Sequence, residues 1–323
     1  MLFRFALPLL FAAALGARLF AEEEVAAARP GLVDEREVMT QLQIFLDQQL
    51  FGPGKIDGRG GEFTTKALWC YQRAHDLPPT GRLDQNIPID SVFPIYAEYT
   101  IRDEDLQYVG DLPAKPPEQS KKKYLPYDSL LEFLTERFHC DPKLLEKINP
   151  DLKLDDLKPG DVVRVPNVEE FKIEDLPKQG KLSAKPEYKH RVIKISRKHR
   201  LLELSDGGAL IASVPITPGS DQTPTPEGSW KIAGIAAMPT FRWDEGVLNH
   251  GVRTDQFYML PAGPNNPVGV LWCQLNKPGI GIHGTNMPQT IGRSASHGCM
   301  RVANWDIVRL AHMITPEMTV EIR

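Results

Sequence analysis

The sequence predicts a multidomain α+β protein with a small three-helix bundle, a strand–helix–helix–strand module and a mainly β domain whose sheet is sandwich-like or barrel-like. Its 323 residues exceed one ordinary domain. Apolar residues follow helical spacing near the start, whereas short alternating segments predominate from Lys189 onward. We therefore expect three modules, over residues 35–96, 97–168 and 186–323.

Composition limits the classes of partner. Hydrophobic residues make up 41% of the chain and charged residues 25%, which is typical of globular proteins. The net charge is −4 and would be −6 without residues 1–21, which carry Arg4 and Arg18 but no acid. Nucleic-acid-binding domains are usually strongly basic, so we expect no nucleic-acid partner.

The first 21 residues predict an export signal. Arg4 precedes an apolar run over residues 5–17, which is short for a membrane span, and small residues at Ala17 and Ala21 offer cleavage points. A core helix or a membrane anchor is the alternative, although Pro8 and the acidic run after residue 21 suit neither. No later segment is apolar enough to cross a bilayer, so we expect an exported protein without a membrane span once the signal is removed.

Residues 35–96 are expected to be helical. The stretch "VMTQLQIFLDQQL" has helical periodicity, and a glycine-rich loop leads to a second helix capped by Thr64 or Thr65. This region resembles the small three-helix peptidoglycan-binding domain in the residues Asp57, Gly58, Thr65, Ala67, Leu68, Tyr71 and Gln72. A helical spacer is the alternative, because periodicity names no ligand.

Residues 97–168 show the order strand, helix, helix, strand. "EYTI" opens a strand, "YDSLLEFLTERF" and "DPKLLEKINPD" predict two short helices, and "LKPGDVVRVPN" predicts a turn into a strand. This order resembles the LysM glycan-binding module, most specifically through Asn149, Pro150, Leu157, Pro159, Gly160, Val163 and Pro166. The glycine-containing turn of that family is missing and about twenty residues look inserted, so a structural linker domain is the alternative.

The third module carries the chemically informative stretch, "IHGTNMPQTIGRSASHGCMRVANWD" from residue 282. We expect it on loops and strand ends of a β domain, where catalytic groups are often found. A thiol needs a base or a positive charge to react as thiolate near neutral pH. His283 or His297 could assist Cys299, and Gly284 and Gly298 permit tight turns that aim backbone amides at one point.

This stretch resembles the signature of the L,D-transpeptidase catalytic domain, the YkuD family, and the likeness extends upstream to about Tyr188. The resemblance implies that Cys299 is the nucleophile and His283 the general base and acid, oriented by the carbonyl of Gly284. It implies support from His297 and an oxyanion hole of amides near Gly298. The same resemblance implies substrate-binding roles for the polar residues around the motif: Arg301, Asn304, Thr285 and Ser296.

The reaction implied is acyl transfer on peptidoglycan, in a periplasm or cell wall. Cys299 would attack the bond before the terminal D-alanine of a tetrapeptide stem, and an amine would resolve the thioester. Water as acceptor would make the protein an L,D-carboxypeptidase, and a catalytically inactive wall-binding protein is a further alternative. No cofactor or metal is implied, the partners are stem peptides and glycan strands, and we expect a monomer. The acceptor, the third stem residue and the envelope type stay open.

Other readings of the same residues remain. His283, His297 and Cys299 could be structural, or could form a zinc site with His250. Among the other cysteines, Cys70, Cys140 and Cys273, we expect at most one disulfide. A chain of this length can form a hydrophobic core that is stable without disulfide cross-links. A thiol probe that labels Cys299 even in mild acid would indicate an activated thiolate.

Overall fold

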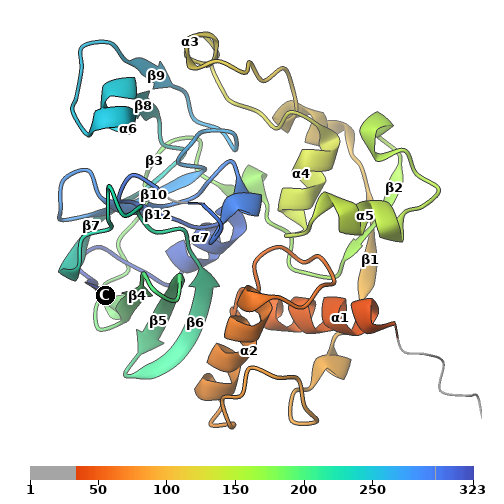
Figure 1. Cartoon of the computed structure of the whole chain (residues 1–323). Coiled ribbons are helices and arrows are strands. Elements are labelled where there is room, and N and C mark those ends of the chain that lie inside the picture. Colours follow the sequence, from red (N-terminus) through yellow and green to blue (C-terminus); the bar gives the residue numbers. More distant parts are fainter. Residues whose placement is uncertain (1–33, 295) are drawn as a thin grey trace, which may run out of the picture. The chain divides into compact units, whose positions relative to one another are not determined.

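The computed structural model describes residues 34–294 and 296–323, shown in Figure 1. The expected export signal over residues 1–21 lies outside the described residues. Residues 36–323 form one compact unit. Within the described part of the chain, no helix is long and apolar enough to cross a membrane.

The first module consists of helices α1 (Glu35–Gln48) and α2 (Glu62–Ala74) around a glycine-rich loop. The buried side chain of Gln43 holds this loop, because its amide oxygen accepts the backbone N–H of Gly58 at 2.9 Å. The expected helix cap is wrong: α2 is capped by Gly61, and Thr64 accepts a hydrogen bond from Gln43 instead. The expected third helix is a single 3₁₀ turn, η1 (Ile89–Ser91), because four prolines and a glycine interrupt residues 78–94.

The second module has the predicted order. Strands β1 (Tyr96–Thr100) and β2 (Val162–Pro166) pair antiparallel, with helices α4 (Leu130–Arg137) and α5 (Pro142–Ile148) between them. The remaining short elements are η2 (Asp103–Tyr108), α3 (Pro116–Gln119), η3 (Leu154–Asp156) and, after β2, η4 (Ile173–Asp175). The inserted segment therefore holds η2 and α3, and the LysM resemblance stays a prediction.

One mixed nine-stranded sheet forms the third module, in the order β12-β11-β10-β7-β13-β4-β5-β6 with β3 added to β7. The strands are β3 (Gly180–Lys181), β4 (Val192–Ser196), β5 (Leu201–Asp206), β6 (Ala209–Pro215), β7 (Gly228–Ala237), β10 (Leu271–Leu275), β11 (Gly281–His283), β12 (Met300–Arg301) and β13 (Thr319–Ile322). Only the pairs β11–β12 and β13–β4 are parallel. The mainly β prediction is confirmed, and the strands form one continuous open sheet, not two packed layers.

A short hairpin and several helical segments complete this module. They are η5 (Pro186–Tyr188), β8 (Phe241–Trp243), α6 (Glu245–His250), β9 (Tyr258–Leu260), η6 (Pro288–Thr290) and α7 (Asn304–Ala311). The apolar spacing from Trp305 to Met313 is helical and corresponds to α7. Helix α6 lacks apolar periodicity and was not expected; Asp244 caps it by accepting backbone N–H groups of its first turn.

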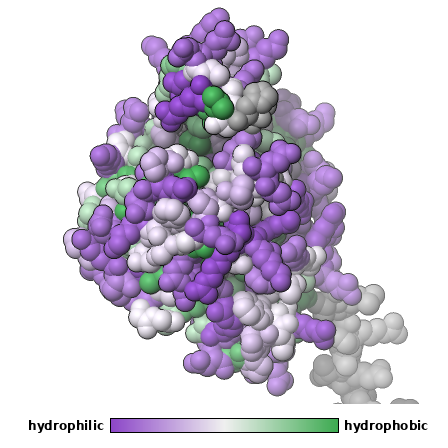
Figure 2. Space-filling view, turned by 60° about the vertical axis from the view of Figure 1, so that its left-hand side comes forward, coloured by the Kyte–Doolittle hydropathy of each residue, from purple (hydrophilic) through white to green (hydrophobic). Residues whose placement is uncertain are grey.

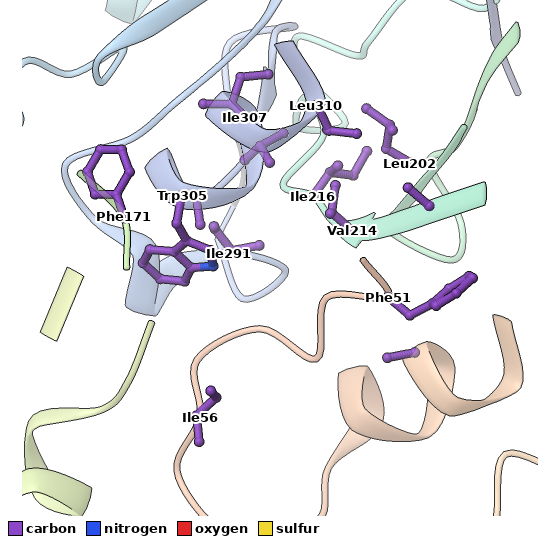
Figure 3. Packing of buried hydrophobic residues seen from close by; sticks show 14 of the residues in the cluster. Phe51, Ile56, Phe171, Leu202, Val214, Ile216, Ile291, Trp305, Ile307 and Leu310 are labelled. Carbon is purple, nitrogen blue, oxygen red and sulfur yellow. The ribbon is translucent and has the colours of Figure 1, made fainter. Parts of the chain in front are cut away.

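The hydrophobic core runs through all three modules. Buried side chains of the first module, the connector and the third module belong to one cluster, which Figure 3 shows around Phe51, Phe171 and Trp305. Residues 169–185, which join the second and third modules, are part of this structure, since Phe171 is buried and β3 joins the sheet. Figure 2 shows one face of the molecule, covered mostly by hydrophilic residues with small scattered apolar spots. All four cysteines are free thiols.

Candidate active site

Two parallel strands bring the motif residues together. In the pairing of β11 with β12, His283 lies opposite Arg301 and Ile282 opposite Met300. Cys299 directly precedes β12, so strand alternation places its side chain on the same face of the sheet as Arg301 and His283. The fifteen residues between His283 and Cys299, described here except for residue 295, therefore connect two neighbouring strand ends.

His283 is held in a defined orientation. Its ring is buried, stacks on Trp272 at 5.3 Å between centroids, and its Nδ1 lies 2.6 Å from the carbonyl oxygen of Gly284. Nδ1–H donates to this carbonyl, which leaves Nε2 as the unprotonated nitrogen of the neutral ring. Burial lowers the pKa of His283 to about 4, against the hydrogen bond to Gly284, and the charge of Arg301 lowers it further. The imidazole is therefore neutral at physiological pH.

Cys299 is half-buried, and its thiol donates to the carbonyl of Gly279 at 3.4 Å. Burial raises the pKa of this thiol, while the backbone N–H of Gly281 and the charge of Arg301 act in the opposite direction. The resting pair is therefore a neutral thiol and a neutral imidazole. From this direction we expect that a thiol probe does not label Cys299 in mild acid.

The loop before Cys299 is anchored by polar contacts. The buried hydroxyl of Ser296 donates to the carbonyl of Cys299, and the carbonyl of Ser296 accepts from the backbone of Ser220 at 2.9 Å. Gly298 has a φ of 103°, which a residue with a side chain rarely adopts. Ser296 and Gly298 therefore shape the turn into the cysteine.

Asn304 and Thr285 are buried and hold backbone groups. The side-chain oxygen of Asn304 accepts from the N–H of Val270 at 3.1 Å, and its nitrogen donates to Glu136 at 2.7 Å. A Cβ atom on Gly284 would lie 2.1 Å from the oxygen of Asn304, so a larger residue cannot stand there. Thr285 accepts the N–H of Met287 at 3.1 Å. The substrate-binding roles expected for both stay predictions, since each side chain already fixes the backbone around His283.

Arg301 and His297 lie where a ligand could reach them. Arg301 is half-buried, and its backbone pairs with Thr217 through two hydrogen bonds of 2.9 and 3.0 Å. His297 is exposed beside the cysteine loop. Within the described residues no three His, Cys, Asp or Glu side chains form a group that could hold a metal ion.

Sequence reasoning missed several contributors to this site. Gly279 and Gly281 contact the sulfur through their backbones, and Glu136 of α4 reaches Asn304 from another module. The glycines in "KPGIGIHG" were a usable signal for close backbone approach. Nothing in the local sequence of α4 indicated Glu136.

A half-exposed thiol on the same sheet face as a neutral, backbone-oriented imidazole is a combination suited to acyl transfer through a cysteine. Comparison of the sequence with known protein families narrows the class of protein further. Residues 190–322 match the family YkuD, described as "L,D-transpeptidase catalytic domain", and residues 35–87 match "Putative peptidoglycan binding domain".

The curated relatives carry the same family name. "Putative L,D-transpeptidase YkuD" of Bacillus licheniformis is 26% identical over 184 residues, which cover 57% of this chain and 87% of the relative. The Bacillus subtilis protein of that name is 37% identical over 79 residues, 24% of this chain and 48% of the relative. The chain therefore carries an L,D-transpeptidase catalytic domain of the YkuD family and an N-terminal peptidoglycan-binding domain, and it is an enzyme of that family.

Solved structures give a weaker likeness. L,D-transpeptidase 3 from Mycobacterium tuberculosis matches with 17% identity and a TM-score of 0.35, over 52% of this chain and 76% of that one. The Enterococcus faecium L,D-transpeptidase matches with 19% identity and a TM-score of 0.32, over 42% and 50%. At these scores the structural likeness carries no argument of its own.

Proposed function

We propose that the protein is an exported L,D-transpeptidase that acts on the tetrapeptide stems of peptidoglycan through a thioester on Cys299. The observation that carries this proposal is the pairing of β11 with β12, which sets a backbone-oriented His283 on the same sheet face as the cysteine. The family membership of the domain supplies the substrate class.

In the first half-reaction the imidazole acts as base. Nε2 of His283 takes the thiol proton while the sulfur attacks the carbonyl carbon before the terminal D-alanine. Backbone N–H groups near Gly298 and Cys299 stabilise the tetrahedral oxyanion. The C–N bond then breaks, the imidazolium gives its proton to the leaving amine, and D-alanine departs from the thioester.

In the second half-reaction an acceptor amine attacks the thioester. His283 takes a proton from the amine, the new amide forms, and the proton returns to the departing sulfur. Because the resting thiol has a raised pKa and the imidazole is neutral, the thiolate forms as the substrate binds and does not precede it. Arg301, on the same face, provides a cation for a stem carboxylate.

Incubation with a purified disaccharide tetrapeptide, followed by mass analysis, tests the proposal. We expect release of D-alanine and a crosslinked dimer, and neither product from Cys299→Ala. A product that lacks D-alanine without a dimer would identify water as the acceptor. D-alanine release that persists in Cys299→Ala would refute the assignment of the nucleophile, and no release from the wild type would favour an inactive wall-binding protein.

The other two modules are proposed to hold the enzyme on its polymer. A matched peptidoglycan-binding domain beside the catalytic domain raises the local concentration of stems. A glycan-binding role for residues 97–168, cleavage of residues 1–21 and a location in the periplasm or cell wall as a monomer belong to the same proposal.

A further inference from the structure

A polar cavity of about 560 Å³ lies where the three modules meet. Its walls are the glycine-rich loop over residues 53–64, the start of α5, the loop over residues 288–293 and the beginning of α7. Neither Cys299 nor His283 lines it. Its volume is in the range of small-ligand sites, which is about 300–1,000 Å³.

Two buried polar atoms on α7 mark this cavity. Trp305 is 2% exposed and Asp306 is 1% exposed, yet the indole nitrogen of the first and Oδ2 of the second have no hydrogen-bond partner among the described residues. Both side chains are otherwise fixed, because Trp305 stacks on His139 at 5.2 Å and Oδ1 of Asp306 accepts from Arg309 at 2.7 Å. Leaving such a group unpaired costs about 1–3 kcal/mol.

The indole nitrogen points toward one wall of the cavity but is itself covered by other atoms. In Figure 3 it lies on the side of the ring toward Ile291, which also lines the cavity. Oδ2 of Asp306, one residue further along α7, is covered in the same way.

The rim carries positive charge. Arg59 of the glycine-rich loop and Arg293 of the loop over residues 288–293 both line the cavity and are exposed. Within the described residues neither guanidinium has a carboxylate within salt-bridge distance. Lys55, in contrast, is already paired with Asp141 at 2.7 Å. Two unpaired guanidinium groups favour carboxylates on a ligand.

The walls are held in place by the fold. Gln43 fixes the glycine-rich loop, and a Cβ atom on Gly292 would lie 2.0 Å from the ring of Phe63, so loop 288–293 packs directly on the first module. Gly292 also donates its N–H to the hydroxyl of Thr217 at 2.8 Å, and Thr217 pairs with Arg301. A ligand on this loop therefore touches the segment that leads into the active site.

We propose that this cavity is a second, non-catalytic site for a short peptide that carries carboxylates. The two arginines bind the carboxylates, and Trp305 and Asp306 line the cavity beside the bound peptide. The choice of a peptidoglycan stem as that peptide rests on the proposed function.

Two tryptophans let one experiment separate the sites. The indole N–H of Trp305 reports the cavity, while Trp272, stacked on His283, reports the catalytic centre. The full chain with Cys299→Ala, labelled with ¹⁵N in its tryptophans, is titrated with a disaccharide tetrapeptide and followed by NMR. Trp305→Phe and Trp272→Phe assign the two resonances.

We expect both resonances to shift with separate midpoints. Replacing both Arg59 and Arg293 with alanine should raise the midpoint for Trp305 at least about tenfold, as expected for lost bonds to charged groups, and leave that for Trp272 unchanged. Arg82→Ala, an exposed arginine of the first module outside the cavity lining, is the matched control and should change neither.

A Trp305 resonance that stays in place at every concentration would overturn the proposal. A Trp305 shift that follows the Trp272 midpoint and ignores the arginine substitutions would overturn it too, because the change would then be transmitted from the catalytic centre. D-alanine release by the wild type is measured separately. Failure of release, with an arginine-dependent Trp305 shift, would refute the proposed function and retain the site.

Discussion

Arg301 affects both of the proposed reacting groups. Burial is the larger cause in each case, raising the pKa of the Cys299 thiol and lowering that of the His283 imidazole, and the charge of Arg301 acts to lower both. The same guanidinium lies on the sheet face where the substrate is proposed to bind. Its two contributions, to proton affinity and to carboxylate binding, can therefore be measured separately.

We predict that Arg301→Gln lowers kcat/KM about 10-fold to 100-fold, mainly through KM, since a hydrogen bond to a charged group contributes about 1.5–3 kcal/mol. We also predict that the acidic limb of the pH profile moves to higher pH, because His283 loses a neighbouring positive charge. The measurement is D-alanine release between pH 4 and pH 9. If KM stayed unchanged while the acidic limb of the pH profile shifted, Arg301 would act only through its charge on His283 and would not bind the substrate carboxylate.

The buried imidazole also makes stability depend on pH. His283 has a pKa of about 4 in the folded chain against 6.5 for the free side chain. Below pH 6.5 the unfolded chain binds the proton that the folded chain excludes. The free energy of unfolding is therefore undiminished above pH 6.5 and falls as the pH drops toward 4.

We predict that His283 accounts for up to about 3 kcal/mol of this loss, at about 1.36 kcal/mol per pKa unit. Urea unfolding at pH 7 and at pH 4 should show a smaller difference in His283→Asn than in the wild type. Equal differences in the two proteins would contradict a strongly depressed pKa for this histidine.

At the scale of elements, α4 of the second module supports His283, the proposed catalytic base. Glu136 accepts from Asn304, whose oxygen lies against Gly284, and Gly284 orients His283. Burial raises the pKa of Glu136 to about 8, against hydrogen bonds from Tyr127 and Asn304. At pH 7 the side chain is therefore mostly a neutral acid with one accepting oxygen.

We predict that Glu136→Gln keeps near-normal activity at pH 7, because glutamine imitates the neutral acid. Glu136→Ala frees Asn304 and should lower kcat about tenfold or more with little change in KM, since small displacements of catalytic groups are costly. Above pH 8 the wild type should lose activity as Glu136 ionises, while Glu136→Gln should not. Kinetics over pH 6–9 check this; a loss in Glu136→Ala through KM alone would contradict a positioning role.

The sequence predicted elements much better than the contacts between them. Strands β4 to β7 and helices α1, α4, α5 and α7 follow from periodicity, which depends on neighbouring residues. The cysteine and histidine of the site were found because both lie in one stretch. Glu136 and Asn304 are 168 residues apart, and Asp47 and Arg309 are 262 residues apart. No local pattern encodes such pairs, so the burial of Asn304 could not be foreseen, whereas the prolines of residues 78–94 were a local signal against the third helix.

At the scale of the whole molecule, one buried group of charges joins the modules. Both carboxylate oxygens of Asp47 in α1 accept from Arg309 of α7 at 2.9 Å, and Nδ1 of His139 lies 3.1 Å from the same carboxylate. Burial opposes ionisation of Asp47, but the charges of Arg309 and His139 outweigh it and hold its pKa well below the usual range. The hydrophobic core crosses the same junction.

We therefore predict that the chain unfolds as one cooperative unit. Asp47→Ala should lower its free energy of unfolding by about 3–5 kcal/mol, which is the usual loss when one partner of a buried ion pair is removed. Urea titrations followed by circular dichroism and by tryptophan fluorescence should move together. Glu62→Gln, which breaks a pair exposed on the surface of the same module, is the control and should cost less than about 1 kcal/mol. If Asp47→Ala lowered the midpoint of only an early, partial unfolding transition, the modules would unfold independently of one another. In that case α4 would have to hold His283 in place even after the first module had unfolded. The hydrophobic core that the modules share argues against this behaviour.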